Sequence, residues 1–209
     1  MKKVSRLVCL LLCGAIAAST GGCSGSGEKE YPVSVVYADF EQWAPDFQTI
    51  RMTPYAGVLH INEDKKYAKD NQSLLIRPMG QYTTGSKSTF IFPSYSEQFG
   101  FDYRDFNKTT SISFDFYNAE KQTKKVAVGL APIISSTESF IYTNLSWQEL
   151  APDAWTTITY EVDTEELGKT YNLSSVAGFY VSFENSGSRK EEDAAEIYLD
   201  NIILNRITN

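Results

Sequence analysis

Apolar and polar residues alternate in short segments along most of this chain. Ile112, Phe114 and Phe116 fall on one face of an extended segment, while Ser113 and Asp115 fall on the other. A segment with this pattern buries one face and exposes the other to water, as the strands of packed antiparallel sheets do. The pattern therefore predicts antiparallel sheets with an apolar layer between them.

Ten segments rich in β-branched and aromatic residues, bounded by turn residues, are expected to be strands. They span residues 33–40, 57–62, 73–78, 87–92, 110–118, 124–131, 139–146, 156–163, 177–185 and 195–206. Helical signal is confined to residues 164–168 and to the stretch around 95–99. Because strands do not alternate with helices, the predicted fold is all-β, a two-sheet antiparallel β-sandwich or jelly roll.

The first 22 residues have the three-part layout of a secretory signal. Lys2, Lys3 and Arg6 precede an apolar run over residues 7–18, and small residues follow at 19–22. The apolar run is about 12 residues long, whereas a helix needs about 20 to cross a bilayer. Export is therefore a better interpretation than a membrane-spanning anchor.

Residues 20–23 read Thr-Gly-Gly-Cys and resemble the lipobox of bacterial lipoproteins. The resemblance implies that residues 1–22 are removed as a lipoprotein signal peptide and that Cys23 becomes the lipidated first residue. The protein is then expected at the cell surface, anchored to a bacterial membrane through the lipid on Cys23. The alternative is an ordinary signal peptide cut nearby, with Cys23 left free.

The chain from Cys23 onward is interpreted as a tether followed by one domain. Residues 23–31 are rich in Ser, Gly and charged side chains, which predicts flexibility, and residues 32–209 have the size of a single β-sandwich domain. Cys9 and Cys13 leave with the signal, so the domain has no disulfide. Loss of the signal takes Lys+Arg from 19 to 16 against 26 Asp+Glu, and the net charge from −7 to −10. We therefore expect no nucleic-acid partner.

Six segments share a recognisable pattern: residues 39–41, which close the first expected strand, and residues 73–76, 101–106, 112–118, 155–160 and 197–202. Together they resemble the galactose-binding-like β-sandwich, a fold common among carbohydrate-binding modules. The same fold also serves as a spacer or a protein-contact module. The resemblance therefore implies the fold and leaves the function open.

The resemblance also implies a position for a structural calcium ion, although no cofactor is required. It places the first and last strands side by side, which brings Glu41 near Asp200, and calcium takes carboxylate and carbonyl oxygens. Asn201 stands where many relatives have a second Asp. The alternative is that Asp200 and Asn201 simply end a strand and hydrogen-bond a neighbouring loop.

A sugar site needs a flat aromatic ring beside hydrogen-bonding groups, because a pyranose has one apolar face and a rim of hydroxyls. Tyr142, Asn144 and Trp147 are the candidate ligand-binding residues. Tyr142 and Asn144 share one face of the expected strand at 139–146, and Trp147 would join them only through a bulge or a loop.

The other two tryptophans are interpreted as structural. Trp155 starts an expected strand, a position that in the resembling modules packs at a sheet edge. Trp43 follows the first strand beside Pro45, and we expect it to be largely buried, as tryptophan usually is.

The sequence gives little support for catalysis. A Ser or Cys nucleophile needs a nearby base, and the one histidine, His60, lies in an alternating segment where a histidine is usually structural. The acidic runs at residues 165–166 and 191–193 are interpreted as solvated turns rather than as the carboxylate pair of a glycosidase. We therefore expect that the protein is not an enzyme.

Two functions remain open. The first is a cell-surface lipoprotein whose non-catalytic β-sandwich holds a polysaccharide or oligosaccharide near the membrane. The second is a structural or protein-interaction lipoprotein of a surface complex, with no glycan site. Exposed aromatic rings gathered on one concave face would favour the first, and an apolar or charged patch without a groove would favour the second.

Overall fold

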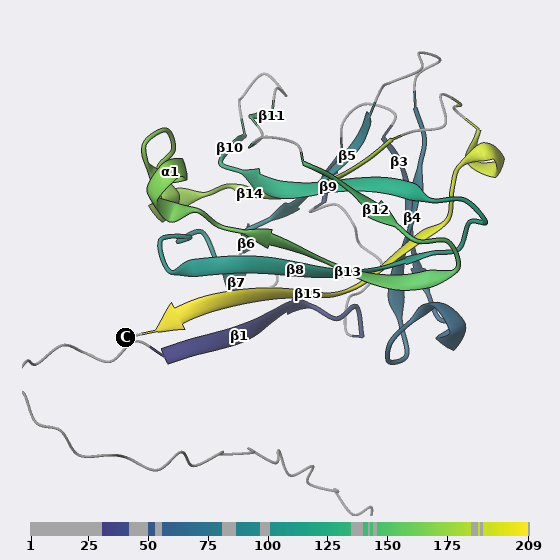
Figure 1. Cartoon of the computed structure of the whole chain (residues 1–209), viewed down its shortest axis with the longest axis horizontal. Helices are drawn as coiled ribbons and strands as arrows, with labels where there is room; N and C mark the ends of the chain where they lie inside the picture. Colours follow the sequence, from purple (N-terminus) through teal and green to yellow (C-terminus); the bar gives the residue numbers. More distant parts are fainter. Residues whose placement is uncertain are drawn as a thin grey trace, which may run out of the picture.

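Two antiparallel β-sheets lie face to face with an apolar layer between them (Figure 1). The computed structural model describes residues 31–41, 50–52, 56–80, 87–96, 101–134, 140–141, 143, 146–184, 188 and 190–208. Within these residues the fold is the expected two-sheet antiparallel β-sandwich, so the predicted fold class is confirmed.

Sheet A contains six strands, in which β15 is the long central one. The order is β13 (Ala154–Glu161), β8 (Thr109–Asn118), β15 (Ile197–Thr208), β4 (Ser73–Pro78) and β3 (Gly57–Asn62), and β1 (Tyr31–Ala38) also pairs with β15. The first and last strands are therefore neighbours, as the resemblance implied.

Sheet B contains five strands. The order is β12 (Trp147–Leu150), β9 (Lys124–Ala131), β14 (Gly178–Glu184), β5 (Lys87–Pro93) and β2 (Arg51–Met52). Two further strand pairs lie outside the sheets, β6 (Tyr95–Ser96) with β7 (Phe101–Asp102), and β10 (Ile133–Ile134) with β11 (Phe140–Ile141). The helical elements are α1 (Thr164–Gly168) and the 3-10 helices Lys65–Tyr67, Leu173–Ser175 and Glu191–Asp193.

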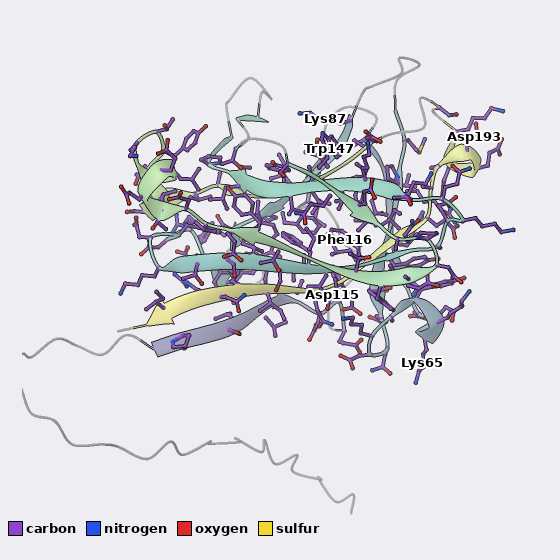
Figure 2. The ribbon with its side chains drawn as sticks, in the orientation of Figure 1. Lys65, Lys87, Asp115, Phe116, Trp147 and Asp193 are labelled. Carbon is purple, nitrogen blue, oxygen red and sulfur yellow. The ribbon has the colours of Figure 1, made fainter. Side chains whose placement is uncertain are left out.

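The layer between the sheets is built from the faces that the alternating pattern predicted. Phe114 and Phe116 of β8 meet Phe179 and Phe183 of β14 edge to face, with ring centroids 5.7 Å apart for Phe114 and Phe179 and 6.0 Å apart for Phe116 and Phe183. All four side chains are buried, and Figure 2 shows Phe116 between the two sheets. The period of two along these strands therefore identified the core correctly.

β15 changes its partner at Asp200 and Asn201. Its first residues pair with β4 and its later ones pair with β1, and its register against β8 shifts after Asp200. Asn201 has a φ of 46°, a left-handed conformation that Asn tolerates better than most residues. The bulge at this point separates β4 from β1, and Asp200 lies where the two strands part.

Two of the predicted elements are wrong. Residues 139–146 do not form one strand: β11 contains only Phe140–Ile141, and a separate strand, β12, begins at Trp147. The stretch around 95–99 is not helical where it is described, because Tyr95–Ser96 pairs with Phe101–Asp102 as a short hairpin. The other nine expected strands and the helix at 164–168 occur within two residues of their predicted ends.

Candidate functional site

The outer face of sheet B, which points away from the core, has a tryptophan at its edge. β12 is the edge strand, and its first residue, Trp147, lies opposite Ala127 of β9. Opposed residues of an antiparallel pair share a face, and Ala127 belongs to a small apolar cluster separate from the main core. Trp147 is 37% exposed, so its ring lies on this outer face and is partly open to solvent.

Thr143, which lies between β11 and β12 in the sequence, packs against the same face. Tyr180 of β14 is fully buried, and its hydroxyl donates a hydrogen bond to the carbonyl oxygen of Thr143 at 3.2 Å. The backbone N–H of Leu130 donates to Thr143 Oγ1 at 3.1 Å. A Cβ at Gly129 would lie only 2.6 Å from Thr143 Oγ1, so this close approach depends on glycine. Thr143 therefore lies against the face that carries Trp147.

Four charged side chains of alternating sign cross the same face. Glu149 of β12, Lys125 of β9, Glu184 of β14 and Lys87 of β5 form what we call the charged row. Glu149 lies opposite Lys125 and Glu184 lies opposite Lys87, while Lys125 Nζ is 3.7 Å from Glu184 Oε1. All four are exposed, and Figure 2 shows Trp147 and Lys87 on the same side of the molecule. Hydrogen-bond donors and acceptors thus alternate beside a partly exposed indole ring.

The structure describes one of the three predicted ligand-binding residues. Tyr142 and Asn144 lie outside the described residues, so their part in a site stays a prediction. Trp147 was expected where a strand runs into a loop, whereas it begins a strand. Thr143, between Tyr142 and Asn144 in the sequence, lies on the outer face of sheet B together with Trp147. Thr143 and Ser146 belong to no strand, and whether Trp147 shares a site with Tyr142 and Asn144 stays a prediction.

Trp155 has the structural position expected of it. It belongs to β13, the edge strand of sheet A, and its ring centroid is 5.5 Å from that of Tyr117. Lys69 Nζ lies 5.4 Å from the centroid of the Trp155 ring. Trp43 lies outside the described residues.

Glu41 and Asp200, the predicted calcium ligands, both hold the segment at residues 69–72. Glu41 Oε1 accepts hydrogen bonds from the backbone N–H groups of Asn71 and Gln72, each at 2.7 Å, and Glu41 Oε2 accepts one from Asn71 Nδ2 at 2.8 Å. Asp200 Oδ2 accepts one from the backbone N–H of Lys69 at 2.8 Å. The bonds from Asn71 lower the pKa of Glu41, helped by the bond from Gln72.

Asp200 is almost completely buried where β4 and β1 part. Burial raises the pKa of its carboxyl to about 6, and the nearby charges of Asp70 and Asp115 act in the same direction. The bonds from the N–H groups of Lys69 and Asn201 oppose this rise. The carboxyl is therefore close to its titration midpoint at mildly acidic pH.

The donor set around Glu41 and Asp200 fits calcium only in part. Calcium takes about six to eight oxygen ligands, and no group of three or more His, Cys, Asp or Glu residues within the described ranges is placed to hold a metal ion. A calcium ion here would have to complete its shell with backbone carbonyls or water. The calcium site stays a prediction.

His60 lies on the outer face of sheet A, in a surface ion-pair network. Its Nε2 is 3.4 Å from Glu191 Oε1, and its side chain is 52% exposed. Arg77 joins Glu191 to Glu196, with both nitrogen–oxygen distances at 2.5 Å. Bonds from Arg77 and His60 lower the pKa of Glu191. The network connects β3 and β4 to the turn before β15.

The sequence did not point to the charged row. Lys125, Glu184 and Lys87 occupy outward positions near the ends of expected strands, so the period of two could have placed each of them on the outer face. Glu149 fell outside every expected strand. Their alignment depends on the register between four strands, which the alternating pattern does not determine.

No protein-family model matches this sequence, and no curated protein matches it significantly. Solved structures share its fold. One is an endo-1,4-β-D-xylanase from Clostridium thermocellum with CBM22-1 and GH10 modules, complexed with xylohexaose. The TM-score is 0.56 at 12% sequence identity, and the match covers 84% of this chain and 29% of the xylanase chain.

Two further structures have the same fold. The family 11 carbohydrate-binding module from Clostridium thermocellum, in complex with a β-1,3-1,4-mixed-linked tetrasaccharide, has a TM-score of 0.50 at 14% identity, over 82% of this chain and 94% of that chain. An exo-β-agarase has a TM-score of 0.51 at 13% identity, over 83% of this chain and 24% of the agarase. The protein therefore has the β-sandwich fold of carbohydrate-binding modules.

Cys23 and the tether at 23–31 lie outside the described residues. Among the residues that are described, no helix combines the length and apolar character needed to span a membrane. The signal peptide, the lipid anchor and the domain boundaries stay predictions.

Proposed function

We propose that this protein binds a polysaccharide or oligosaccharide on the outer face of sheet B, without breaking bonds in it. The observation that carries the proposal is the partly exposed ring of Trp147 beside the charged row, on a fold shared with carbohydrate-binding modules. An indole ring packs against the apolar face of a pyranose, and carboxylate and ammonium groups hydrogen-bond its hydroxyls. The direction of the charged row, across the strands, suits an extended glycan.

The proposed site holds the glycan by shape and hydrogen bonds alone. Charged side chains of both signs keep it close to neutral, which suits a ligand whose polar groups are hydroxyls. Tyr142 and Asn144 are proposed to add contacts from the loop that leads to Trp147. The lipid on Cys23 is proposed to keep the domain, with its bound glycan, at the surface of a bacterial membrane.

Affinity electrophoresis tests the glycan site. The chain from Ser24 onward, which contains every described residue, is run through gels with plant, host and microbial polysaccharides, with and without calcium. We expect one glycan class to retard the wild-type chain and Trp155→Ala, but not Trp147→Ala. Tyr142→Ala and Asn144→Ala should weaken retardation. If no polymer retards the chain, or if Trp147→Ala migrates like the wild type, the proposed function is wrong.

Fractionation of bacterial cells tests the anchor. The wild-type chain should partition with membranes and carry a lipid mass on its N-terminal peptide, while Cys23→Ser should lose both properties. An N-terminal peptide with an unmodified Cys23 would overturn the lipidation and leave the glycan site untouched.

A second function is supported by the exposed edge of sheet A. Val33 and Val36 of β1 are 40% and 52% exposed, and β1 pairs only with β15 among the described strands. Unpaired strand edges with apolar side chains are surfaces on which other chains dock. If Val36→Lys abolishes co-purification with a surface complex while glycan retention is absent throughout, the protein-interaction function replaces the first.

A further inference from the structure

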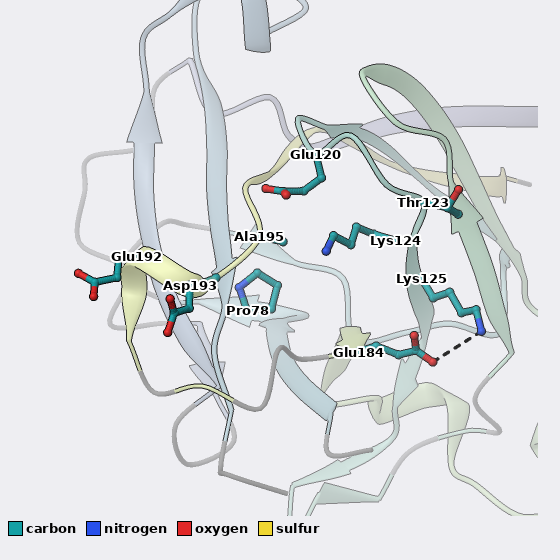
Figure 3. A pocket seen from close by; sticks show the side chains of 10 residues that line it. Pro78, Glu120, Thr123, Lys124, Lys125, Glu184, Glu192, Asp193 and Ala195 are labelled. Carbon is teal, nitrogen blue, oxygen red and sulfur yellow. Dashed lines mark ion pairs between the residues drawn. The ribbon is translucent and has the colours of Figure 1, made fainter. Parts of the chain in front are cut away.

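A polar pocket of about 380 Å³ lies at one end of the sandwich (Figure 3). It is formed where the last residue of β4, Pro78, meets the turn that leads from β8 into β9 and the 3-10 helix Glu191–Asp193. Lys125 and Glu184 form its rim, and both also belong to the charged row. The pocket therefore adjoins the outer face of sheet B.

Several charged groups around the pocket already have partners. Lys125 and Glu184 pair with each other across 3.7 Å, and Glu192 pairs with Lys190 at 3.4 Å. Asp193 Oδ2 accepts a hydrogen bond from the Ser188 hydroxyl at 2.7 Å. These contacts neutralise part of the charge of the lining.

Lys124 differs from the other charged side chains of the pocket. It is half-buried at the start of β9, and its ammonium group has no ion pair or hydrogen bond within the part of the chain that the structure describes. Figure 3 shows this group pointing into the hollow, which Glu120 and Asp193 also line. Glu120 uses Oε1 to accept the backbone N–H of Glu196 at 3.1 Å, which leaves Oε2 toward the pocket.

We propose that this pocket binds a single neutral sugar residue, the end or a branch of the glycan held on the outer face of sheet B. This inference rests on the proposed function and adds a subsite to it. Lys124 donates to hydroxyl or ring oxygens, Glu120 and Asp193 accept from neighbouring hydroxyls, and the ring of Pro78 provides an apolar wall. The volume is at the small end of ligand pockets, which run from about 300 to 1,000 Å³.

The mixed charge of the lining selects the ligand class. A bare phosphate would face the carboxylates of Glu120 and Asp193, and a free cation would face the ammonium group of Lys124. A ligand with many hydroxyl groups satisfies both signs at once, because each hydroxyl both donates and accepts. The pocket binds the terminal or branching sugar residue, while Trp147 and the charged row bind the rest of the glycan.

Nuclear magnetic resonance titration of the labelled chain from Ser24 onward tests the subsite. The probes are D-glucose, D-galactose, D-mannose, D-xylose and D-glucuronate, each added to millimolar concentration. We expect one neutral sugar to shift the amide signals of Lys124, Glu120 and Ala194 in a saturable way. Lys124→Ala should weaken this binding about tenfold, as loss of one charge-assisted hydrogen bond does.

Three further variants complete the test, and Trp147→Ala separates this proposal from the proposed function. Lys121→Ala, an exposed lysine on the same turn that does not line the pocket, should bind the sugar like the wild type. Trp147→Ala should keep the sugar in the pocket while it loses retention on polysaccharide gels. Glu120→Gln should also weaken binding of the sugar. Thermal unfolding is monitored in each variant.

The outcomes are distinguishable. Polysaccharide retention without any sugar-induced shift at the pocket overturns the subsite and leaves the proposed function standing. Tighter binding of D-glucuronate than of every neutral sugar overturns the proposal that the ligand is a neutral sugar. Saturable sugar binding at the pocket without retention on any polymer supports the subsite and overturns the extended site at Trp147.

Discussion

The sharpest physical prediction concerns Asp200, whose buried carboxyl group lies where β4 and β1 part in sheet A. Asp200→Asn removes its charge and keeps one of the two oxygens that accept hydrogen bonds from the backbone N–H groups of Lys69 and Asn201. In the presence of a chelator, we expect this variant to gain stability relative to the wild type as the pH rises from 4 to 8. The reason is that burial raises the pKa of Asp200 to about 6 in the folded protein.

The sign and size of this change in the free energy of unfolding follow from proton linkage. The ordinary pKa of the carboxyl is 3.8, and the folded value is about 6, so the folded state binds the proton more tightly than the unfolded chain. The stabilisation from Asp200 is therefore complete below about pH 4 and is lost as the pH rises through about 6. The shift corresponds to at most about 3 kcal/mol, and relaxation of the surroundings around the charged carboxylate reduces this to about 1–2 kcal/mol.

Urea unfolding between pH 4 and pH 8 measures the effect. The difference in free energy of unfolding between Asp200→Asn and the wild type should grow by about 1–2 kcal/mol across this range. Glu165→Gln, on the exposed first turn of α1, should give a difference that stays within about 0.5 kcal/mol. A difference for Asp200→Asn that is flat, or that falls with rising pH, would refute the reasoning.

The same series with calcium in place of chelator tests the predicted metal site. Calcium binds the ionised carboxylate, so it should stabilise the wild type most above pH 6 and should lower the apparent pKa of Asp200. Asp200→Asn should lose most of this gain. Equal unfolding curves with calcium and with chelator would show that the prediction of calcium at Glu41 and Asp200 is wrong.

Three other substitutions give simple outcomes in thermal or urea unfolding. Trp155→Ala should cost about 2 kcal/mol through lost packing, and it should leave glycan retention on gels unchanged. Gly178→Ala would place a Cβ 2.3 Å from the carbonyl oxygen of Phe92, so it should cost about 1–3 kcal/mol or more. Gly168→Ala meets its nearest atom at 3.9 Å and should change stability by less than about 0.5 kcal/mol; equal effects of the two glycine substitutions would contradict this account.

The local pattern of apolar and polar residues was sufficient to predict most of the fold. The alternation at Ile112, Phe114 and Phe116 identified a core strand because one face of each central strand packs against the other sheet. The adjacency of the first and last strands came from the resemblance, and the pairing of β1 with β15 confirms it. These features depend on residue type and on the period of two, which a single sequence displays.

The edge of sheet B could not be predicted in the same way. β12 reads Trp-Gln-Glu-Leu, with no β-branched residue, and it is a strand because it pairs with β9. The hydrogen bonds that define it come from residues about 20 positions earlier in the chain, and strand propensity depends strongly on such context. For the same reason the sequence suggested Trp147 as a ligand contact but not the charged row beside it.

Calcium and glycan are expected to act independently, because their predicted sites lie on opposite sides of the core. Figure 2 shows Asp115, the cross-strand neighbour of Asp200, on the opposite side of the sandwich from Trp147 and Lys87. The layer of Phe114, Phe116 and their partners lies between the two sides. Glycan retention at 20 °C should therefore be the same with calcium and with chelator, provided that the chain stays folded, while the temperature at which retention is lost should follow the unfolding temperature. A change in retention in the fully folded chain on removal of calcium would mean that a metal contacts the glycan, and the site would then have to be sought away from Glu41 and Asp200.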